Sequence, residues 1–230
     1  MTYTIEKCES KDPLYPKAFS NLKGMPSNLY YKGDISVLNQ YNCVAIVGSR
    51  KCTDEGLIFA RAAGQKAAEL GLVVINGLAL GCDTAAILGA LDAKGKCVVM
   101  MPCGLNKIYP KTNEQLADRI LNQGGCLISE YEPDEEPKKF TYVRRDRLQS
   151  AASQGVLVVE ASLESGTMNT VEAAIKQSRR LAAYTTKIAM GTGNKYIIES
   201  GNAAISDLQQ LQDFYLSLQK DTEYEQLSFL

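Results

Sequence analysis

Histidine is missing from this sequence of 230 residues, and its absence narrows the chemistry available to the chain. Without histidine, neither a Ser-His nor a Cys-His catalytic pair can form, and every histidine-ligated metal site is excluded. Any acid or base must then be Asp, Glu, Lys, Tyr or Cys. The sequence therefore excludes the commonest catalytic arrangements of hydrolases and metalloenzymes, which depend on histidine.

Other features are missing as well. The seven cysteines, at positions 8, 43, 52, 82, 97, 103 and 126, include no Cys-x-x-Cys pair, so we expect reduced, buried thiols in a cytoplasmic protein. The N-terminus has no apolar signal region, and no apolar run approaches the ~20 residues of a membrane span. A net charge of -1 excludes a globally basic nucleic-acid binder. Any anion site must come from local cations and backbone dipoles.

What the chain does have is a regular alternation of apolar runs and helix-like stretches from residue 42 onward. The apolar runs predict strands at 43–47, 72–75, 96–101, 126–129, 155–159 and 180–184. The segments between them predict helices at 55–70, 83–93, 113–122, 144–153, 167–178 and 194–200. Short, continuous apolar strands alternating with helices indicate an α/β fold, with a mostly parallel sheet and helices on both faces.

The two ends of the chain differ from this pattern. Residues 1–40 are broken by Pro and Gly, so we expect an extension packed on the core. The core domain is expected over 41–205. In the last part, 206–230, the pattern predicts one amphipathic helix over 204–220 and a loose acidic tail over 221–230.

The first glycine turn, Gly48-Ser49-Arg50, lies where a dinucleotide-binding chain carries Gly-x-Gly-x-x-Gly, but neither that fingerprint nor the Walker pattern is present. Parallel strands gather such turns at one sheet edge, where backbone N–H groups and helix N-termini attract anions. Arg50 can bind a phosphate through two hydrogen bonds. The alternatives are a surface salt bridge for Arg50 and a purely structural turn for Gly48.

A second turn, Ser165-Gly166-Thr167, supplies two hydroxyls and an unhindered backbone at the expected start of a helix. These groups suit an oxyanion or a phosphate, although on their own they are more typical of a plain N-cap. Two such turns at one sheet edge favour a shared pocket.

Cations concentrate in Lys138-Lys139 and Arg144-Arg145-Asp146-Arg147, with Phe140 and Tyr142 between them. Basic residues interleaved with aromatic ones suit single-stranded nucleic acid, because cations bind phosphates and rings stack on bases. The alternative is a solvated helix face that balances the acidic residues 134–136. Cys103 is a conceivable nucleophile, but a small buried residue is favoured because no histidine can activate its thiol.

Together these segments resemble the core of the DNA-processing protein A (DprA/Smf) family, in unbroken order from about residue 13 to residue 205. The matching motifs are Val44–Arg50, Asn76–Asp83, Gly89–Leu91, Gly104-Leu105 with Tyr109-Pro110 and Asn113, Ser129-Glu130, Arg145–Arg147, Val156–Ala161, Ser165–Thr167, and Gly191–Asn194 followed by Ile197-Ile198. The resemblance implies an extended Rossmann-like domain that binds single-stranded DNA and forms a homodimer. It also implies that the protein helps to load a RecA-type recombinase during DNA uptake and recombination, in natural transformation.

The resemblance also implies roles for individual residues. Arg50 holds phosphate, Lys139 contacts DNA, Tyr142 stacks on a base, and Arg145 and Arg147 line the same groove. Gly104 and the Ser165-Gly166-Thr167 turn form the pocket floor. The family's usual Arg-Asn-Arg is Arg145-Asp146-Arg147 here, which puts a negative charge into the groove. The predicted DNA- and phosphate-binding residues are Gly48, Ser49, Arg50, Gly77, Gly104, Lys138, Lys139, Tyr142, Arg145, Arg147, Ser165, Gly166 and Thr167.

The sequence thus predicts a cytoplasmic protein that binds single-stranded DNA without sequence preference, with no catalytic residue, metal, cofactor or membrane partner. The alternative is a nucleotide-binding or nucleotide-cleaving protein of the lysine-decarboxylase-like superfamily, which includes phosphoribohydrolases. That superfamily carries a glutamate where this chain has Thr170, so Glu160, Glu164 or Glu172 would have to replace it. A scaffold that only assembles protein partners is the third possibility.

Overall fold

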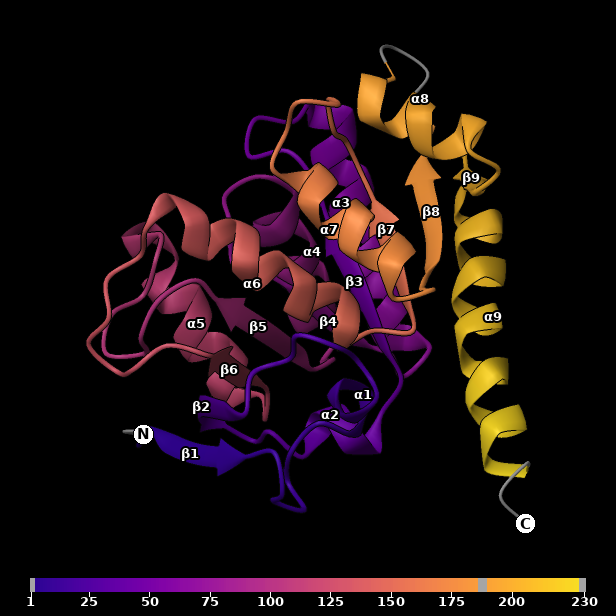
Figure 1. Cartoon of the computed structure of the whole chain (residues 1–230). Coiled ribbons are helices and arrows are strands. Elements are labelled where there is room, and N and C mark those ends of the chain that lie inside the picture. Colours follow the sequence, from indigo (N-terminus) through magenta and orange to yellow (C-terminus); the bar gives the residue numbers. More distant parts are fainter. Residues whose placement is uncertain (1–2, 186–189, 228–230) are drawn as a thin grey trace.

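A single sheet runs through the molecule, and most of it is parallel (Figure 1). The computed structural model describes residues 3–185 and 190–227. In these ranges the strands are β1 (Glu6–Glu9), β2 (Asn28–Gly33), β3 (Cys43–Val47), β4 (Val73–Asn76), β5 (Cys97–Met101), β6 (Cys126–Ser129), β7 (Gly155–Val158), β8 (Arg180–Tyr184) and β9 (Ala203–Ile205). Their order is β1-β2-β6-β5-β4-β3-β7-β8-β9. The strands from β3 to β9 pair in parallel, whereas β1 and β2 are antiparallel at one edge.

Helices cover both faces of the sheet, which confirms the predicted fold class. One face is packed by α3 (Asp54–Glu69), α4 (Cys82–Asp92), α5 (Glu114–Asn122) and α9 (Leu208–Leu227). The other is packed by α1 (Lys17–Ser20), α2 (Val37–Gln40), α6 (Lys139–Ala151), α7 (Thr167–Lys176) and α8 (Thr192–Glu199). A short 3-10 turn, Lys111–Asn113, precedes α5.

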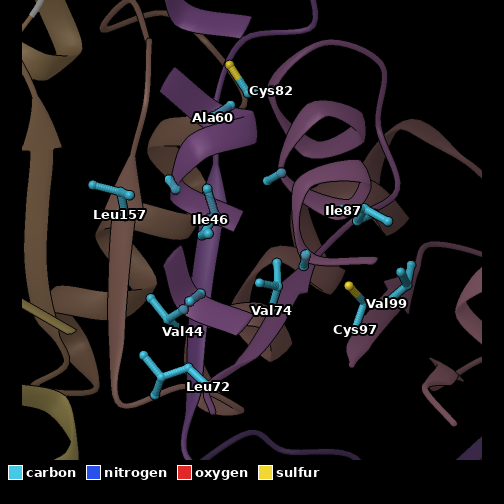
Figure 2. Close-up of a cluster of buried hydrophobic side chains, with 14 of the residues drawn as sticks. Val44, Ile46, Ala60, Leu72, Val74, Cys82, Ile87, Cys97, Val99 and Leu157 are labelled. Carbon is cyan, nitrogen blue, oxygen red and sulfur yellow. The ribbon is translucent and has the colours of Figure 1, made fainter. Parts of the chain in front are cut away.

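The central strand β3 explains why the sequence shows a continuous apolar run there. All five of its residues are buried. Val44 and Ile46 join the core under α3 and α4 (Figure 2), whereas Cys43, Ala45 and Val47 join the core on the opposite face. Each fully buried Val or Ile stabilises the fold by about 1.5–3 kcal/mol. Because β3 is buried on both faces, its end is held firmly in the sheet, and so is the start of the turn Gly48–Arg50 that follows it.

The extension over residues 1–40 contributes strands of its own, which the sequence analysis did not predict. β2 pairs with β6 and β1 pairs with β2. Leu29 and Tyr31 on β2 are buried and the residues beside them less so, which is the period-two pattern of a strand. The extension is therefore hydrogen-bonded into the edge of the sheet.

Two helix boundaries also differ from the expectation. α6 begins at Lys139 rather than at 144, and there Thr141 Oγ1 accepts a hydrogen bond from the Lys138 backbone N–H at 2.9 Å. At the other end, 203–205 form β9 and α9 continues through Leu227, so 221–227 are helical rather than a loose tail. Residues 228–230 of that expected tail lie outside the described residues.

The thiols behave as expected from the sequence. All seven cysteines are free, and six of them are buried, with Cys52 partly exposed. Burial raises the pKa of Cys103 to about 11, which disfavours a nucleophilic thiolate there. Within 3–185 and 190–227, every helix is too short or too polar to cross a membrane.

Candidate nucleic-acid interface

A cavity of about 410 Å³ opens beyond the carboxyl ends of β3 and β7. These neighbouring strands lie where the chain order reverses, since the strands that follow β3 extend toward β6 and the later ones extend from β7 toward β9. Open parallel sheets bind ligands at such a point. The turns Gly48–Arg50 and Ser165–Thr167 both line this cavity. The structure thus brings the two predicted turns together.

One face of α6 forms the opposite wall. Tyr142, Asp146 and Gln149 line the cavity at spacings of four and three residues, which places them on one side of the helix, and Val143 lines it beside Tyr142. Asn169 and Thr170 of α7 close the wall from the other side. Sequence reasoning missed Gln149 and Asn169, because a polar residue in a helix is ordinarily part of a solvated face.

Arg50 and Tyr142 meet at the rim of the cavity. The Arg50 guanidinium carbon lies 5.5 Å from the centre of the Tyr142 ring. A cation–π contact of this kind stabilises the pair by about 0.5–1 kcal/mol at an exposed site. Arg50 is exposed and Tyr142 is partly buried. A charged group and an aromatic face are therefore presented side by side to a ligand.

The second turn is held in place from beneath by Asn194, a fully buried residue of α8. Its side chain accepts a hydrogen bond from the Ala161 N–H at 2.7 Å and donates to the Val159 and Tyr184 carbonyls, both at 2.9 Å. The loop that leads from β7 to α7 is thereby fixed, and Gly166 and Thr167 at the start of α7 reach the cavity.

Charged side chains are buried at the inner wall. Arg145 donates to the Met100 carbonyl at 2.7 Å and forms an ion pair with Asp146 at 3.1 Å. Asp83 accepts hydrogen bonds from the Gly77 and Ala79 N–H groups at 2.9 and 3.2 Å. Burial raises the pKa of Asp83 to about 6, against the opposing effects of Arg145 and these two N–H groups. Burial also raises the pKa of Asp146, and the Arg145 charge opposes it.

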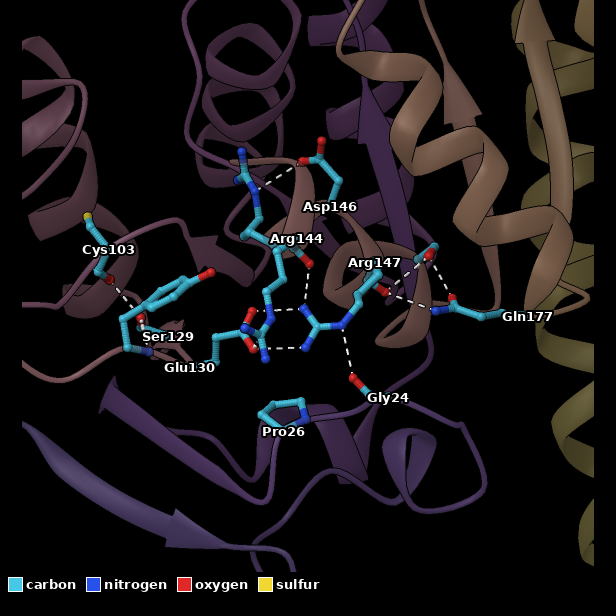
Figure 3. A network of polar contacts seen from close by, with 12 residues as sticks. Gly24, Pro26, Cys103, Ser129, Glu130, Arg144, Asp146, Arg147 and Gln177 are labelled. Carbon is cyan, nitrogen blue, oxygen red and sulfur yellow. Dashed lines mark hydrogen bonds and ion pairs between the residues drawn. The ribbon is translucent and has the colours of Figure 1, made fainter. Parts of the chain in front are cut away.

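Arg147, expected to line the groove, lies elsewhere. Its Nη1 and Nη2 atoms each bind a Glu130 oxygen at 2.8 Å, and its Nε donates to the Gly24 carbonyl at 3.0 Å (Figure 3). Arg144 contacts the same carboxylate at 3.3 Å. Residues two apart on a helix point in different directions, so Arg145 and Arg147 cannot share one groove. Arg147 instead ties the N-terminal extension to α6.

Two of the predicted glycines do not line the cavity either. Gly77 is buried beneath the Arg145 guanidinium. Gly104 is also buried, and its N–H donates to the Glu135 carbonyl at 2.8 Å. Because β5, which leads to Gly104, is separated from β3 by β4, this glycine does not form the pocket floor. The cavity is lined instead by Val47, Gly48 and the Arg145-Asp146 pair.

Lys138 and Lys139 lie at the start of α6, exposed and outside the cavity lining. The first turn of α6 carries no acidic residue, so the positive end of the helix dipole and both lysines act in the same direction. The Lys138 Nζ atom lies 5.9 Å from the centre of the Phe140 ring and 3.8 Å from Glu135 Oε1. The two lysines extend the positive rim along the helix that also carries Tyr142.

Glutamates are the residues that a nucleotide-cleaving protein would need at this cavity, but Glu160, Glu164 and Glu172 do not line it. Glu160 accepts hydrogen bonds from the Thr53 N–H and hydroxyl at 3.0 and 2.9 Å, which fixes the start of α3. Glu164 is exposed, and Glu172 is an exposed partner of Lys176 at 4.0 Å. Among the described residues, the carboxylates that line the cavity are Asp83 and Asp146.

The family model described as DNA recombination-mediator protein A matches residues 7–218. The chain belongs to this family. Within it, the chain is 36% identical to the DNA processing protein DprA of Streptococcus pneumoniae over 202 residues, which are 87% of this chain and 71% of that protein. It is 32% identical to the protein Smf of Escherichia coli over 199 residues, which are 86% of this chain and 53% of that protein. The chain thus spans about half the length of the E. coli relative.

Solved structures of the family share the fold. The X-ray structure of DprA from S. pneumoniae has a TM-score of 0.83 at 34% identity and covers 90% of this chain and 73% of that one. The structure of DNA processing protein A from Helicobacter pylori has a TM-score of 0.83 at 32% identity and covers 95% of this chain and 97% of that one. The Helicobacter structure concerns that protein's single-stranded DNA binding mode.

Proposed function

We propose that this chain binds single-stranded DNA, with the strand entering at the cavity and continuing along the first turns of α6. The observation that carries the proposal is the Arg50 guanidinium held over the Tyr142 ring at the mouth of a cavity. A cation for phosphate and a ring for a base are the two elements that sequence-tolerant single-strand binding requires. The Helicobacter relative, whose structure concerns single-stranded DNA binding, supports this choice of ligand.

One phosphate binds between Arg50 and the N-terminus of α7. The helix has ten residues, Thr167–Lys176, and its first turn faces the cavity through Gly166 and Thr167. A helix N-terminus carries a partial positive charge and unpaired N–H groups, both of which favour phosphate. The Ser49 and Thr167 hydroxyls line the same space and can donate to the remaining phosphate oxygens.

The next nucleotides follow α6. Lys139 lies three residues before Tyr142, hence on the same side of the helix. It takes the neighbouring phosphate while the base stacks on the Tyr142 ring. Phe140 is 57% exposed and offers a second apolar surface next to the lysines. Arg145 and Arg147 position the helix through their internal contacts instead of contacting the strand.

In the cell, the protein would keep a single strand available for recombination and help to load a RecA-type recombinase, working as a homodimer in the cytoplasm. The family description, DNA recombination-mediator protein A, supports this role.

The test is binding of a fluorescent thymidine oligonucleotide, measured by anisotropy at increasing salt. Arg50→Ala and Lys139→Ala should each weaken binding and flatten its salt dependence. Tyr142→Ala should cost about 1–3 kcal/mol of binding free energy and leave the salt dependence nearly unchanged, because stacking displaces no counterions. Lys176→Ala is the matched control, since it removes a cation at the opposite end of α7. Failure to bind the oligonucleotide at about 50–100 mM salt, where phosphate contacts are strong, would contradict the proposal.

A further inference from the structure

Two cysteines that are far apart in the sequence meet beside the turn that carries Arg50. Cys52 is partly exposed in the loop before α3, and Cys82 is buried at the start of α4. Burial raises the pKa of the Cys52 thiol, and a hydrogen bond with the Cys82 thiol opposes that rise. The two thiols are therefore in contact, with one of them accessible to solvent and the other buried behind it.

The buried thiol, that of Cys82, packs directly against the turn. Its side chain belongs to the cluster under α3 and α4 (Figure 2). A Cβ built on Gly48 would lie 2.6 Å from Cys82 Sγ, so only a glycine leaves room for this thiol. The Cys82 N–H also donates to the Ser49 carbonyl at 3.2 Å. Core packing and this hydrogen bond together hold Cys82 in place.

Cys52 follows Arg50 by two residues, in a segment that is anchored at both ends. The Ser49 N–H donates to the Glu160 carbonyl at 2.7 Å. The Thr53 N–H and hydroxyl donate to the Glu160 carboxylate at 3.0 and 2.9 Å. Arg50 lies between these anchors and is exposed. A movement of Cys52 must therefore be accommodated by the short segment that carries Arg50.

We propose that Cys52 and Cys82 form a disulfide when the protein meets a peroxide, and that this disulfide displaces Arg50 and weakens binding at the cavity. The accessible Cys52 thiolate attacks one peroxide oxygen and breaks the O–O bond, which gives a sulfenic acid and, with the proton of the thiol, one water molecule. The Cys82 sulfur then attacks the Cys52 sulfur and releases a second water molecule. Two thiols are oxidised to one disulfide, and one peroxide is reduced to two water molecules.

The effect on Arg50 follows from which cysteine can move. A disulfide bond is much shorter than a contact between two thiols, so one sulfur must approach the other. Cys82 is held in the core, so Cys52 moves and the segment before it shifts. The reduced protein holds the Arg50 guanidinium over the Tyr142 ring, and this shift removes it from that position. The effect on binding rests on the proposed function, whereas the disulfide itself does not.

Mass spectrometry of the oxidised protein tests the disulfide. The protein is treated with hydrogen peroxide at about pH 8.5, where more of Cys52 is thiolate than at neutral pH, and is digested without a reductant. We expect a linked pair of peptides that contain Cys52 and Cys82, lighter by two hydrogen atoms than the separate peptides. Cys43→Ala alters a buried thiol on the other face of β3 and, as the control, should still form the link. Absence of the link in wild type would overturn the inference.

Oligonucleotide binding tests the effect on the turn. Oxidation should weaken binding of a thymidine oligonucleotide by about tenfold, the loss expected when one hydrogen bond to a charged group is broken, and dithiothreitol should restore it. Cys52→Ser cannot form the link, and Arg50→Ala already lacks the guanidinium, so neither affinity should respond to peroxide. Linked wild type that binds within about twofold of the reduced protein would overturn the effect on Arg50. Failure of the reduced protein to bind would instead contradict the proposed function, and the peptide link would still decide the disulfide.

Discussion

Gly77 lies against the buried guanidinium that supports the inner wall, and a methyl group there should displace it. A Cβ built on Gly77 would lie 1.6 Å from Arg145 Nη1. The guanidinium cannot yield easily, because Arg145 is 5% exposed and is held by the Met100 carbonyl at 2.7 Å and by Asp146 at 3.1 Å. We therefore predict that Gly77→Ala is strongly destabilising.

The geometry sets the size of the effect. Restoring a normal contact of about 3.5–4 Å requires the guanidinium to move by roughly 2 Å. A movement of that size breaks the bond to Met100 and distorts the pair with Asp146. Separating a buried charge from its partner costs about 3–5 kcal/mol. Domains of this kind are stable by about 5–15 kcal/mol in total, so Gly77→Ala should lose a large fraction of the stability.

Urea denaturation followed by circular dichroism measures this loss. The matched control is Gly166→Ala, because the nearest heavy atom to a Cβ there is Asn169 Nδ2 at 4.0 Å and the backbone φ is -58°. That substitution should change stability by less than about 1 kcal/mol in either direction, because the lower unfolded-state entropy of Ala is offset by the preference for Gly at a helix N-cap. A Gly77→Ala protein within about 1 kcal/mol of wild type would refute the reasoning, since a buried, paired guanidinium cannot be displaced so cheaply.

Two further predictions concern buried charges. The folded state raises the pKa of Asp83 to about 6 from the ordinary 3.8, so the folded protein favours the protonated carboxyl. The stability that this protonated carboxyl contributes is fully present below about pH 4 and is lost as the pH rises through about 6. The unfolding free energy of wild type relative to Asp83→Asn should thus fall between pH 4 and 7, on the order of 3 kcal/mol; a pH-independent difference in urea denaturation would contradict this. Glu130→Gln should cost about 2–4 kcal/mol by the same assay, because the Glu130 side chain is 3% exposed between two arginines. Glu199→Gln, in an exposed pair with Lys195, is its control and should change little.

The core of the fold was predictable because a strand buried on both faces, such as β3, is a continuous run of apolar residues in the sequence. Fully buried strands and the helices between them leave patterns that need no tertiary information. The edge strands β1 and β2 were missed because Pro and Gly interrupt the extension. The start of α6 was missed because Phe140, Tyr142 and Val143 are weak helix formers. The hydrogen bond from the Lys138 N–H to Thr141 Oγ1 at the start of the helix is visible only in the folded structure.

The site was predictable at its turns and less so at its walls. Glycine turns after strands identify the sheet edge, which is why the Gly48 and Ser165 turns meet as expected. The sequence could not show that Glu130 binds Arg147, because that contact joins α6 to the residue after β6. It could not distinguish Gln149 from a solvated polar residue, since only packing buries its side chain.

The salt dependence of oligonucleotide binding tests the central claim most directly. Arg145 and Arg147 are held by buried carboxylates, whereas Arg50, Lys138 and Lys139 are exposed. These three exposed cations are therefore the ones that we expect to meet phosphates. Each contact on a single strand contributes a slope of roughly -0.7 in log K against log salt. Wild type should give about -2 and Arg50→Ala about -1.4, with Lys176→Ala unchanged from wild type. A wild-type slope near zero, or one that Arg50→Ala does not alter, would contradict phosphate binding at this cavity.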